Sequence, residues 1–178
     1  MKWFLGWVVF MIALVLLTLP NERPDKIDTI GFSTTESAEL YFKNVRSFYY
    51  QNNPEAEGIL DVYRLESIFV DSLPSLPFAM YNNWRTNETF IRLDTAFINT
   101  KAVLAVVSDS AGVKTDTIRF PEMTNESQYL FAKAIYKTLD EKEKLGLVME
   151  SEVIWLPESM NLSIKRTLTD YFRLLGKL

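Results

Sequence analysis

The acidic residues are the side chains of this sequence that could act as catalytic groups by type and spacing. Glu150 and Glu152 fall on one face of a predicted strand, and Asp61 and Glu66 fall on another candidate strand. Two carboxyl groups at a fixed distance are sufficient for hydrolysis of a glycosidic bond, so a carboxylate-dependent hydrolase is one possible function. However, the exposed face of an open sheet also alternates in this way. Because nothing in the spacing separates an acid from a base, we favour solvent exposure for these four residues.

The composition excludes several other kinds of chemistry. The 178 residues include neither cysteine nor histidine, which removes disulfides, thiolate nucleophiles, Cys- or His-ligated metals and Ser-His-Asp triads. The six glycines are all isolated, so no glycine-rich nucleotide-binding loop is expected. Residues 109–116 contain only two acids, too few for a calcium loop. We therefore predict no cofactor and no metal, and the net charge of −4 argues against a nucleic-acid partner.

A long apolar segment near the start of the sequence predicts membrane insertion. Residues 3–19 carry no charged side chain. As a helix they would span about 26 Å, close to the hydrocarbon thickness of a bilayer. Trp3 and Trp7 lie one turn apart near one boundary, where indole rings favour the membrane interface. Since Pro20 would end the helix, we predict a transmembrane signal anchor over residues 1–20.

A cleaved signal peptide and a buried core helix are the two alternatives to an anchor. A cleaved signal peptide would need an unusually long apolar region, and no small-residue cleavage site precedes Pro20. A buried core helix would leave this segment almost no polar face. Lys2 on one side nearly balances Arg23 and Lys26 on the other, so the positive-inside count gives little direction. A short basic tip before an apolar run is typical of secretory signals, so we expect the domain that follows to be extracytoplasmic, which means the periplasm if the source is a Gram-negative bacterium.

The rest of the chain predicts one α+β domain. Residues 21–30 are polar, contain one proline and are typical of a juxtamembrane linker, and residues 31–178 suit a single folded unit. Their order of elements predicts a mainly antiparallel sheet covered by about three helices. The expected helices are 34–50, 125–145 and 157–175, and the expected strands are 59–66, 67–70, 88–94, 102–107, 115–120 and 147–156.

The sequence also predicts the ends of two helices, an irregular segment and one apolar helical face. Ser33 and Glu36 fit a capping box at the start of the first helix, and Gly146 is a natural end for the second. Residues 73–87 contain two prolines, which predicts an irregular or edge segment. The first helix also carries an apolar stripe at helical spacing, formed by Leu40, Tyr41, Phe42, Val45, Phe48 and Tyr49.

Two groups of side chains predict contacts with partners. Aromatic residues in a loop often anchor interfaces, although they can also seal the edge of a sheet. Residues 158–178 contain four bases and two acids, whereas residues 21–157 contain 14 bases and 21 acids. This last helix could rest on an anionic membrane or an acidic partner, or simply turn its basic face to water. The candidate contact residues are Phe78, Tyr81 and Trp84 in the proline-containing segment and Lys165, Arg166 and Arg173 in the last helix.

These features together favour a non-enzymatic function. We expect a single-pass membrane-anchored accessory or scaffolding subunit of a larger membrane protein complex, acting through protein–protein contacts of its extracytoplasmic domain. Residues 3–19 would contact the bilayer, and the domain would contact integral membrane proteins. The first alternative is a membrane-tethered module that binds a lipid or small ligand. The second is the carboxylate-dependent hydrolase.

Overall fold

The fold was analysed in a computed structural model that describes residues 11, 27–54, 59–68, 75–94, 102–108, 114–149 and 152–178. These residues form two four-stranded antiparallel sheets and three α-helices. This confirms the predicted α+β class, the antiparallel strands and the three helices. The strands divide into two sheets, however, where one sheet was expected.

The first sheet is an antiparallel meander in the order β1-β2-β3-β4. Its register pairs Tyr50 with Leu65 at one end, and Leu60 with Asn83 at the other end of β2. A short extended segment continues the sheet beyond β4, since Ser33 forms an isolated bridge with Glu88. The strands are β1 (Tyr50–Pro54), β2 (Leu60–Leu65), β3 (Phe78–Asn83) and β4 (Glu88–Leu93).

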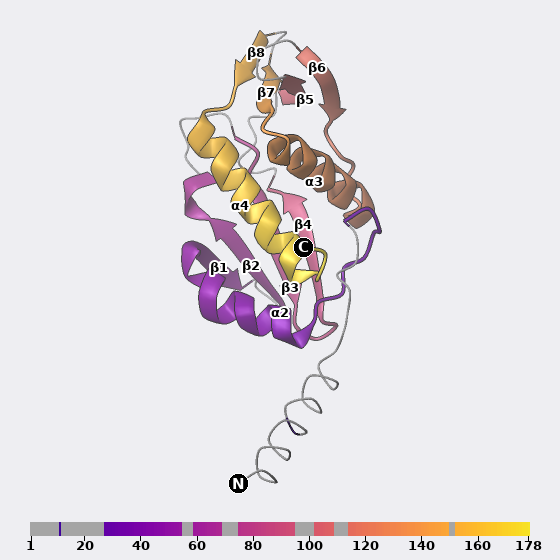
Figure 1. The fold of residues 1–178 in the computed structure, drawn as a ribbon, viewed down its shortest axis with the longest axis vertical. Coiled ribbons are helices and arrows are strands. Elements are labelled where there is room, and N and C mark those ends of the chain that lie inside the picture. The colour runs from indigo at the N-terminus through magenta and orange to yellow at the C-terminus, as the bar shows by residue number, and fades with distance from the viewer. Residues whose placement is uncertain are drawn as a thin grey trace, which may run out of the picture.

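The second sheet has the order β6-β5-β7-β8 and lies at the end of the domain remote from α2 (Figure 1). On β7, Leu145 and Leu147 are buried in the core, whereas Gly146 faces Val153 and Trp155 of β8. The strands are β5 (Ala102–Ser108), β6 (Lys114–Arg119), β7 (Lys144–Met149) and β8 (Glu152–Trp155).

The helices α2 (Glu36–Tyr41), α3 (Asn125–Asp140) and α4 (Glu158–Leu174) pack on these sheets (Figure 1). Helix α4 crosses β3 and β4, while α3 lies beside α4 and also contacts β6 and β7. The apolar stripes of α3 and α4 therefore close one continuous core between these helices and both sheets, whereas α2 has no buried residue. The largest fully buried core side chains include Tyr129, Tyr171, Phe78, Phe172, Ile135 and Ile164.

The first predicted helix, over residues 34–50, is wrong in its extent. The α-helix ends at Tyr41, continues as a π-helical turn over Phe42–Arg46 and a 3₁₀ turn over Ser47–Tyr49, and gives way to β1 at Tyr50. Thr35 is the N-cap, because its hydroxyl accepts the backbone N–H of Ala38, so the expected Ser33–Glu36 capping box is not formed. The expected apolar stripe is also wrong, because only Phe42 of its six members is buried and the other five are 47–81% exposed. Leu40 and Tyr41 are exposed on α2 itself, and Val45, Phe48 and Tyr49 lie in π and 3₁₀ turns, whose period differs from 3.6 residues.

The predicted irregular segment over residues 73–87 is also wrong, because Phe78–Asn83 forms β3 between β2 and β4. Pro77 lies just outside this strand, where its carbonyl accepts the Asp94 N–H and its missing N–H costs no ladder bond. The strand expected over 67–70 is replaced by a 3₁₀ turn, Glu66–Ile68, and residues 69–74 lie outside the described ranges.

The second predicted helix ends earlier than Gly146. Lys142 adopts a left-handed backbone conformation with φ of 62°, and the Glu143 N–H donates to the Thr138 carbonyl. A residue in this conformation ends an α-helix, so α3 stops at Asp140. The predicted single strand over 147–156 is in fact the hairpin of β7 and β8, whose residues 150 and 151 lie outside the described ranges.

Within the described ranges, no helix has the length and apolar character needed to cross a membrane. The predicted anchor over residues 1–20, with Trp3 and Trp7, lies outside those ranges apart from Met11. Residues 21–26 of the predicted linker also lie outside them, whereas residues 27–30 are described and lie against α3.

Candidate functional site

A buried ion pair joins the α2 segment, defined as α2 with the π and 3₁₀ turns that follow it to Tyr49, to α4. The Arg46 guanidinium donates from Nε to Asp170 Oδ1 and from Nη2 to Oδ2, both at 2.8 Å. The Tyr50 hydroxyl donates to the same Oδ2 at 2.8 Å. The Asp170 side chain is 1% exposed and the Arg46 side chain 18%, so the pair is largely shielded from water. A buried bidentate pair of this kind fixes the geometry of the elements that carry it.

Hydrogen bonding and burial within this cluster raise the pKa values of Arg46 and Tyr50. The hydrogen bond to Asp170 raises the pKa of Arg46 above its ordinary value. Burial, reinforced by the neighbouring Asp170 carboxylate, raises the pKa of Tyr50 well above its ordinary value. Arg46 therefore stays charged and Tyr50 stays a neutral hydrogen-bond donor at physiological pH.

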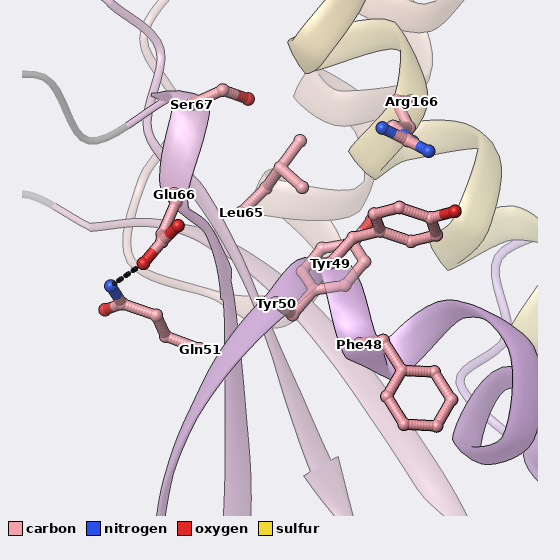
Figure 2. A pocket seen from close by; sticks show the side chains of 8 residues that line it. All are labelled: Phe48, Tyr49, Tyr50, Gln51, Leu65, Glu66, Ser67 and Arg166. Atoms are coloured by element: carbon pink, nitrogen blue, oxygen red, sulfur yellow. Dashed lines mark hydrogen bonds between the residues drawn. The ribbon is translucent and has the colours of Figure 1, made fainter.

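A surface groove of about 560 Å³ lies next to this cluster (Figure 2). One wall comes from the 3₁₀ turn and the start of β1, the other from the end of β2 and the turn after it, and α4 contributes Arg166. Gln51 Nε2 donates to Glu66 Oε1 at 2.7 Å on the far side of the groove from Arg166. The lining residues are Phe48, Tyr49, Tyr50, Gln51, Leu65, Glu66, Ser67 and Arg166.

The Tyr49 ring contacts two arginine guanidinium groups at the groove. The Arg166 guanidinium carbon lies 4.1 Å from the centroid of the Tyr49 ring, and that of Arg46 lies 5.2 Å from it. Because Asp170 fixes Arg46, the ring has a defined place against both guanidinium groups. Phe48 on the rim is 81% exposed, unusually high for a phenylalanine. Within the described part of the chain, no carboxylate forms an ion pair with Arg166.

This arrangement suits recognition of a polypeptide. Exposed aromatic rings supply apolar contact area, and a guanidinium on an aromatic face is oriented for a carboxylate or a peptide carbonyl. Aromatic residues and arginine are the types enriched in protein interfaces. Phe48 and Tyr49 were expected in the apolar stripe of a helix and were not predicted as surface residues. The helical spacing does not separate the two cases, because it assumes a continuous α-helix, whereas Phe48 and Tyr49 lie in a 3₁₀ turn that follows a π turn.

The three predicted aromatic contact residues differ in their exposure to solvent. Phe78 is 0% exposed and packs against Phe131 in the core, so it is not a surface residue. Tyr81 is partly buried on β3 under the Arg92 guanidinium, whose carbon lies 5.3 Å from the ring centroid. Trp84 is 49% exposed in the turn between β3 and β4. This turn lies at the end of the first sheet opposite the groove, so Trp84 does not line it.

The three predicted basic contact residues of α4 also have different surroundings. Arg166 lies in the groove. Lys165 points to α3 instead, where its ammonium lies 3.0 Å from the Asp140 carboxylate and donates to the Leu139 carbonyl. Arg173 is exposed two turns after Arg166 and borders a small cavity beside Tyr41.

The acidic residues do not form a described catalytic pair. Among the described residues that line the groove, Glu66 is the only carboxylate, and it accepts a hydrogen bond from Gln51. Glu150 lies outside the described ranges, and Glu152 is exposed on β8. Within those ranges, no three acidic side chains come close enough together to hold a metal ion. The hydrolase alternative therefore gains no geometric support from these residues.

Comparison of the chain with known protein families, with curated proteins and with solved structures gives no match.

Proposed function

We propose that this protein is a non-enzymatic, single-pass membrane-anchored accessory subunit of a larger membrane protein complex, and that its extracytoplasmic domain binds a partner protein in the groove between β1 and α4. The observation that carries the proposal is the exposed Phe48 beside Tyr49, with Arg166 stacked on the Tyr49 ring. Such a set has the composition of an interface hot spot, because a rigid aromatic surface lies next to an oriented arginine.

The anchor in this proposal rests on the uncharged residues 3–19 and supplies locality. Holding the domain and its partner in one membrane raises their effective concentration, so a groove of modest area can be sufficient for binding. The partner that fits is an integral membrane protein with an extracytoplasmic segment that carries an apolar or aromatic side chain for Phe48 and a carboxylate for Arg166.

Capture of the full-length tagged protein from native membranes in mild detergent tests this proposal. The wild-type protein is compared with the Phe48→Ser/Arg166→Glu variant. The matched control is Leu130→Ser/Arg119→Glu, which changes an exposed leucine on α3 and an exposed arginine on β6. We expect a stoichiometric, salt-stable set of membrane proteins with the wild type and the control, and a loss of about tenfold or more with the groove variant.

Two results would contradict the proposal. A wild-type protein that is monodisperse and without partners would remove the complex-subunit function. Equal capture by the groove variant would remove the groove as the contact surface. The comparison between the two variants requires that both melt within a few degrees of the wild type, as expected for exposed positions.

The second candidate function is binding of a lipid or small ligand, and the volume of the groove favours it. About 560 Å³ is within the range of small-molecule sites. This function predicts a small molecule in the extract of the purified protein and a raised melting temperature when that molecule is added back.

A further inference from the structure

The described residues of the predicted linker, 27–30, are attached to the folded domain. The Asp28 carboxylate lies 2.7 Å from the Lys137 ammonium and 3.5 Å from that of Lys133, both on α3. The Tyr129 hydroxyl donates to the Ile27 carbonyl at 2.8 Å. These contacts hold residues 27–28 against α3, so the polypeptide leaves the domain at a defined place.

A buried lysine completes this attachment. The Lys177 side chain follows Gly176, whose φ of 65° turns the chain after α4. Its ammonium donates to the Thr29 carbonyl at 2.6 Å and lies 5.6 Å from the centroid of the Tyr129 ring. Lys177 is only 7% exposed, which shows that the extended segment and the end of α4 cover it together. Residues 27–31 are thus a fixed strap rather than a free spacer.

The strap leads directly to one end of the domain. Phe32 packs on Phe90 of β4, and the Thr34 N–H donates to the Asn87 carbonyl at 2.8 Å. The turn 84–87 and the first turn of α2 therefore lie next to the strap, at the end of the domain remote from β5–β8 (Figure 1). We call this surface the tether end and define it by the exposed residues Ile30, Leu40, Tyr41, Trp84 and Arg85.

The predicted linker is too short to take the tether end far from the membrane. Only residues 21–26 separate Pro20, where the predicted anchor ends, from the attached Ile27. Even when fully extended, this part of the chain reaches roughly 25 Å. An anchor in the bilayer would therefore keep Ile27 within roughly 25 Å of the point where the chain leaves the membrane.

We propose that the tether end rests on the lipid bilayer beside its own anchor. This inference depends on the anchor of the proposed function. Trp and Tyr rings favour the headgroup region, and Leu40 and Ile30 supply apolar contact. The Arg85 guanidinium carbon lies 5.2 Å from the centroid of the Trp84 ring, and Arg173 lies beside Tyr41, so cationic groups flank the aromatic ones. This pairing fits a surface that contains anionic lipid.

Within the tether end, Trp84 and Arg85 lie at the opposite end of the first sheet from the partner groove. Leu65 lines the groove at one end of β2, while Leu60 at the other end pairs with Asn83, immediately before Trp84. The bilayer contact would therefore leave Phe48 and Arg166 open to a partner. It would also hold the groove in one orientation relative to the membrane, which a free spacer could not do.

Site-specific labelling of the full-length protein tests this proposal. Because the chain has no cysteine, single substitutions can carry an environment-sensitive fluorophore without side reactions. Leu40→Cys and Trp84→Cys report on the tether end, Leu130→Cys and Trp155→Cys are exposed controls elsewhere, and Met11→Cys reports on the anchor. Each labelled protein is reconstituted in phosphatidylethanolamine–phosphatidylglycerol vesicles that contain a nitroxide lipid, and quenching of the fluorophore is measured.

We expect the nitroxide lipid to quench labels at positions 40 and 84 about threefold more than labels at 130 and 155, since only the former would lie at headgroup depth. Quenching at 40 and 84 no greater than at the controls, with the Met11 label quenched, would overturn the bilayer contact and leave the anchor intact. An unquenched Met11 label would overturn both. If labels at 40 and 84 become protected only after addition of solubilised native membrane proteins, the tether end binds protein and the inference is wrong.

Discussion

Arg46 and Asp170 lie 124 residues apart in the sequence, yet their side chains form a bidentate pair with two hydrogen bonds of 2.8 Å. This pair fixes the α2 segment to α4 and, through Arg46, places the Tyr49 ring that Arg166 stacks on. The position of the groove therefore depends on an interaction deep behind it. This relationship leads to the first of four predictions.

Breaking the Arg46–Asp170 pair should destabilise the domain strongly. Arg46→Met leaves the 1%-exposed Asp170 carboxylate without its countercharge, so the free energy of unfolding should fall by about 3 kcal/mol, measured by urea denaturation in mild detergent. Lys43→Met is the control, because it breaks an exposed pair with Glu39 at 3.8 Å and should cost less than about 0.5 kcal/mol. Equal effects of the two variants would show that burial of the Arg46–Asp170 pair has no energetic consequence.

Removal of the Tyr171 hydroxyl and removal of the Tyr50 hydroxyl should change the stability of the domain in opposite directions. The Tyr171 hydroxyl is buried and finds no hydrogen-bond partner within the described residues, so Tyr171→Phe should stabilise the domain by about 1 kcal/mol. The Tyr50 hydroxyl donates to Asp170, so Tyr50→Phe should destabilise it by about 1 kcal/mol. Thermal unfolding measures both changes. Destabilisation by Tyr171→Phe would indicate that its hydroxyl has a partner.

Alkaline pH should unfold the domain. Burial raises the pKa of Tyr63 to about 12, and it raises those of Tyr50 and Tyr171 further. Above the ordinary tyrosine pKa of about 10, the unfolded chain loses these protons while the folded chain keeps them. Stability should therefore be constant below about pH 10 and fall above it by up to about 1.4 kcal/mol per pH unit for each tyrosine.

Urea denaturation between neutral pH and pH near 11 checks this slope. In the Tyr63→Phe variant, the free energy of unfolding should fall less steeply with pH, by the contribution of one tyrosine. A Tyr136→Phe variant is a useful control, because Tyr136 is only partly buried. A slope that Tyr63→Phe leaves unchanged would contradict the assignment.

Gly146 should be intolerant of a side chain. A Cβ at this position of β7 would lie 2.9 Å from both the Trp155 ring and a Val153 methyl, so Gly146→Ala must displace β8 side chains and should cost about 1–3 kcal/mol. The nearest atom to a Cβ at Gly31 is the Lys177 ammonium at 3.5 Å, an ordinary contact, so Gly31→Ala should be nearly neutral. Thermal melts that rank the two variants in the opposite order would contradict this packing.

The sequence by itself determined the features that depend on local chemistry. Alternation of apolar residues located strands such as 59–66 and 88–94, and the 3.6-residue period predicted helices over 125–145 and 157–175, where α3 and α4 form. The absence of cysteine and histidine restricted the possible chemistry, and the uncharged residues 3–19 predict the anchor. Each of these signals is read from residues close together in the chain.

Only the tertiary structure decided the features that depend on distant residues. Strand β3 was missed because Pro74 and Pro77 argue locally against a strand, whereas pairing with β2 and β4 stabilises one immediately after Pro77. Phe48 and Tyr49 were read as part of a helical stripe, but the π and 3₁₀ turns placed them on the surface. Arg166 became part of a groove because Asp170 positions Arg46 and Arg46 contacts Tyr49. A periodic pattern measures only angles along one element, so it cannot specify which distant charge or ring that element will meet.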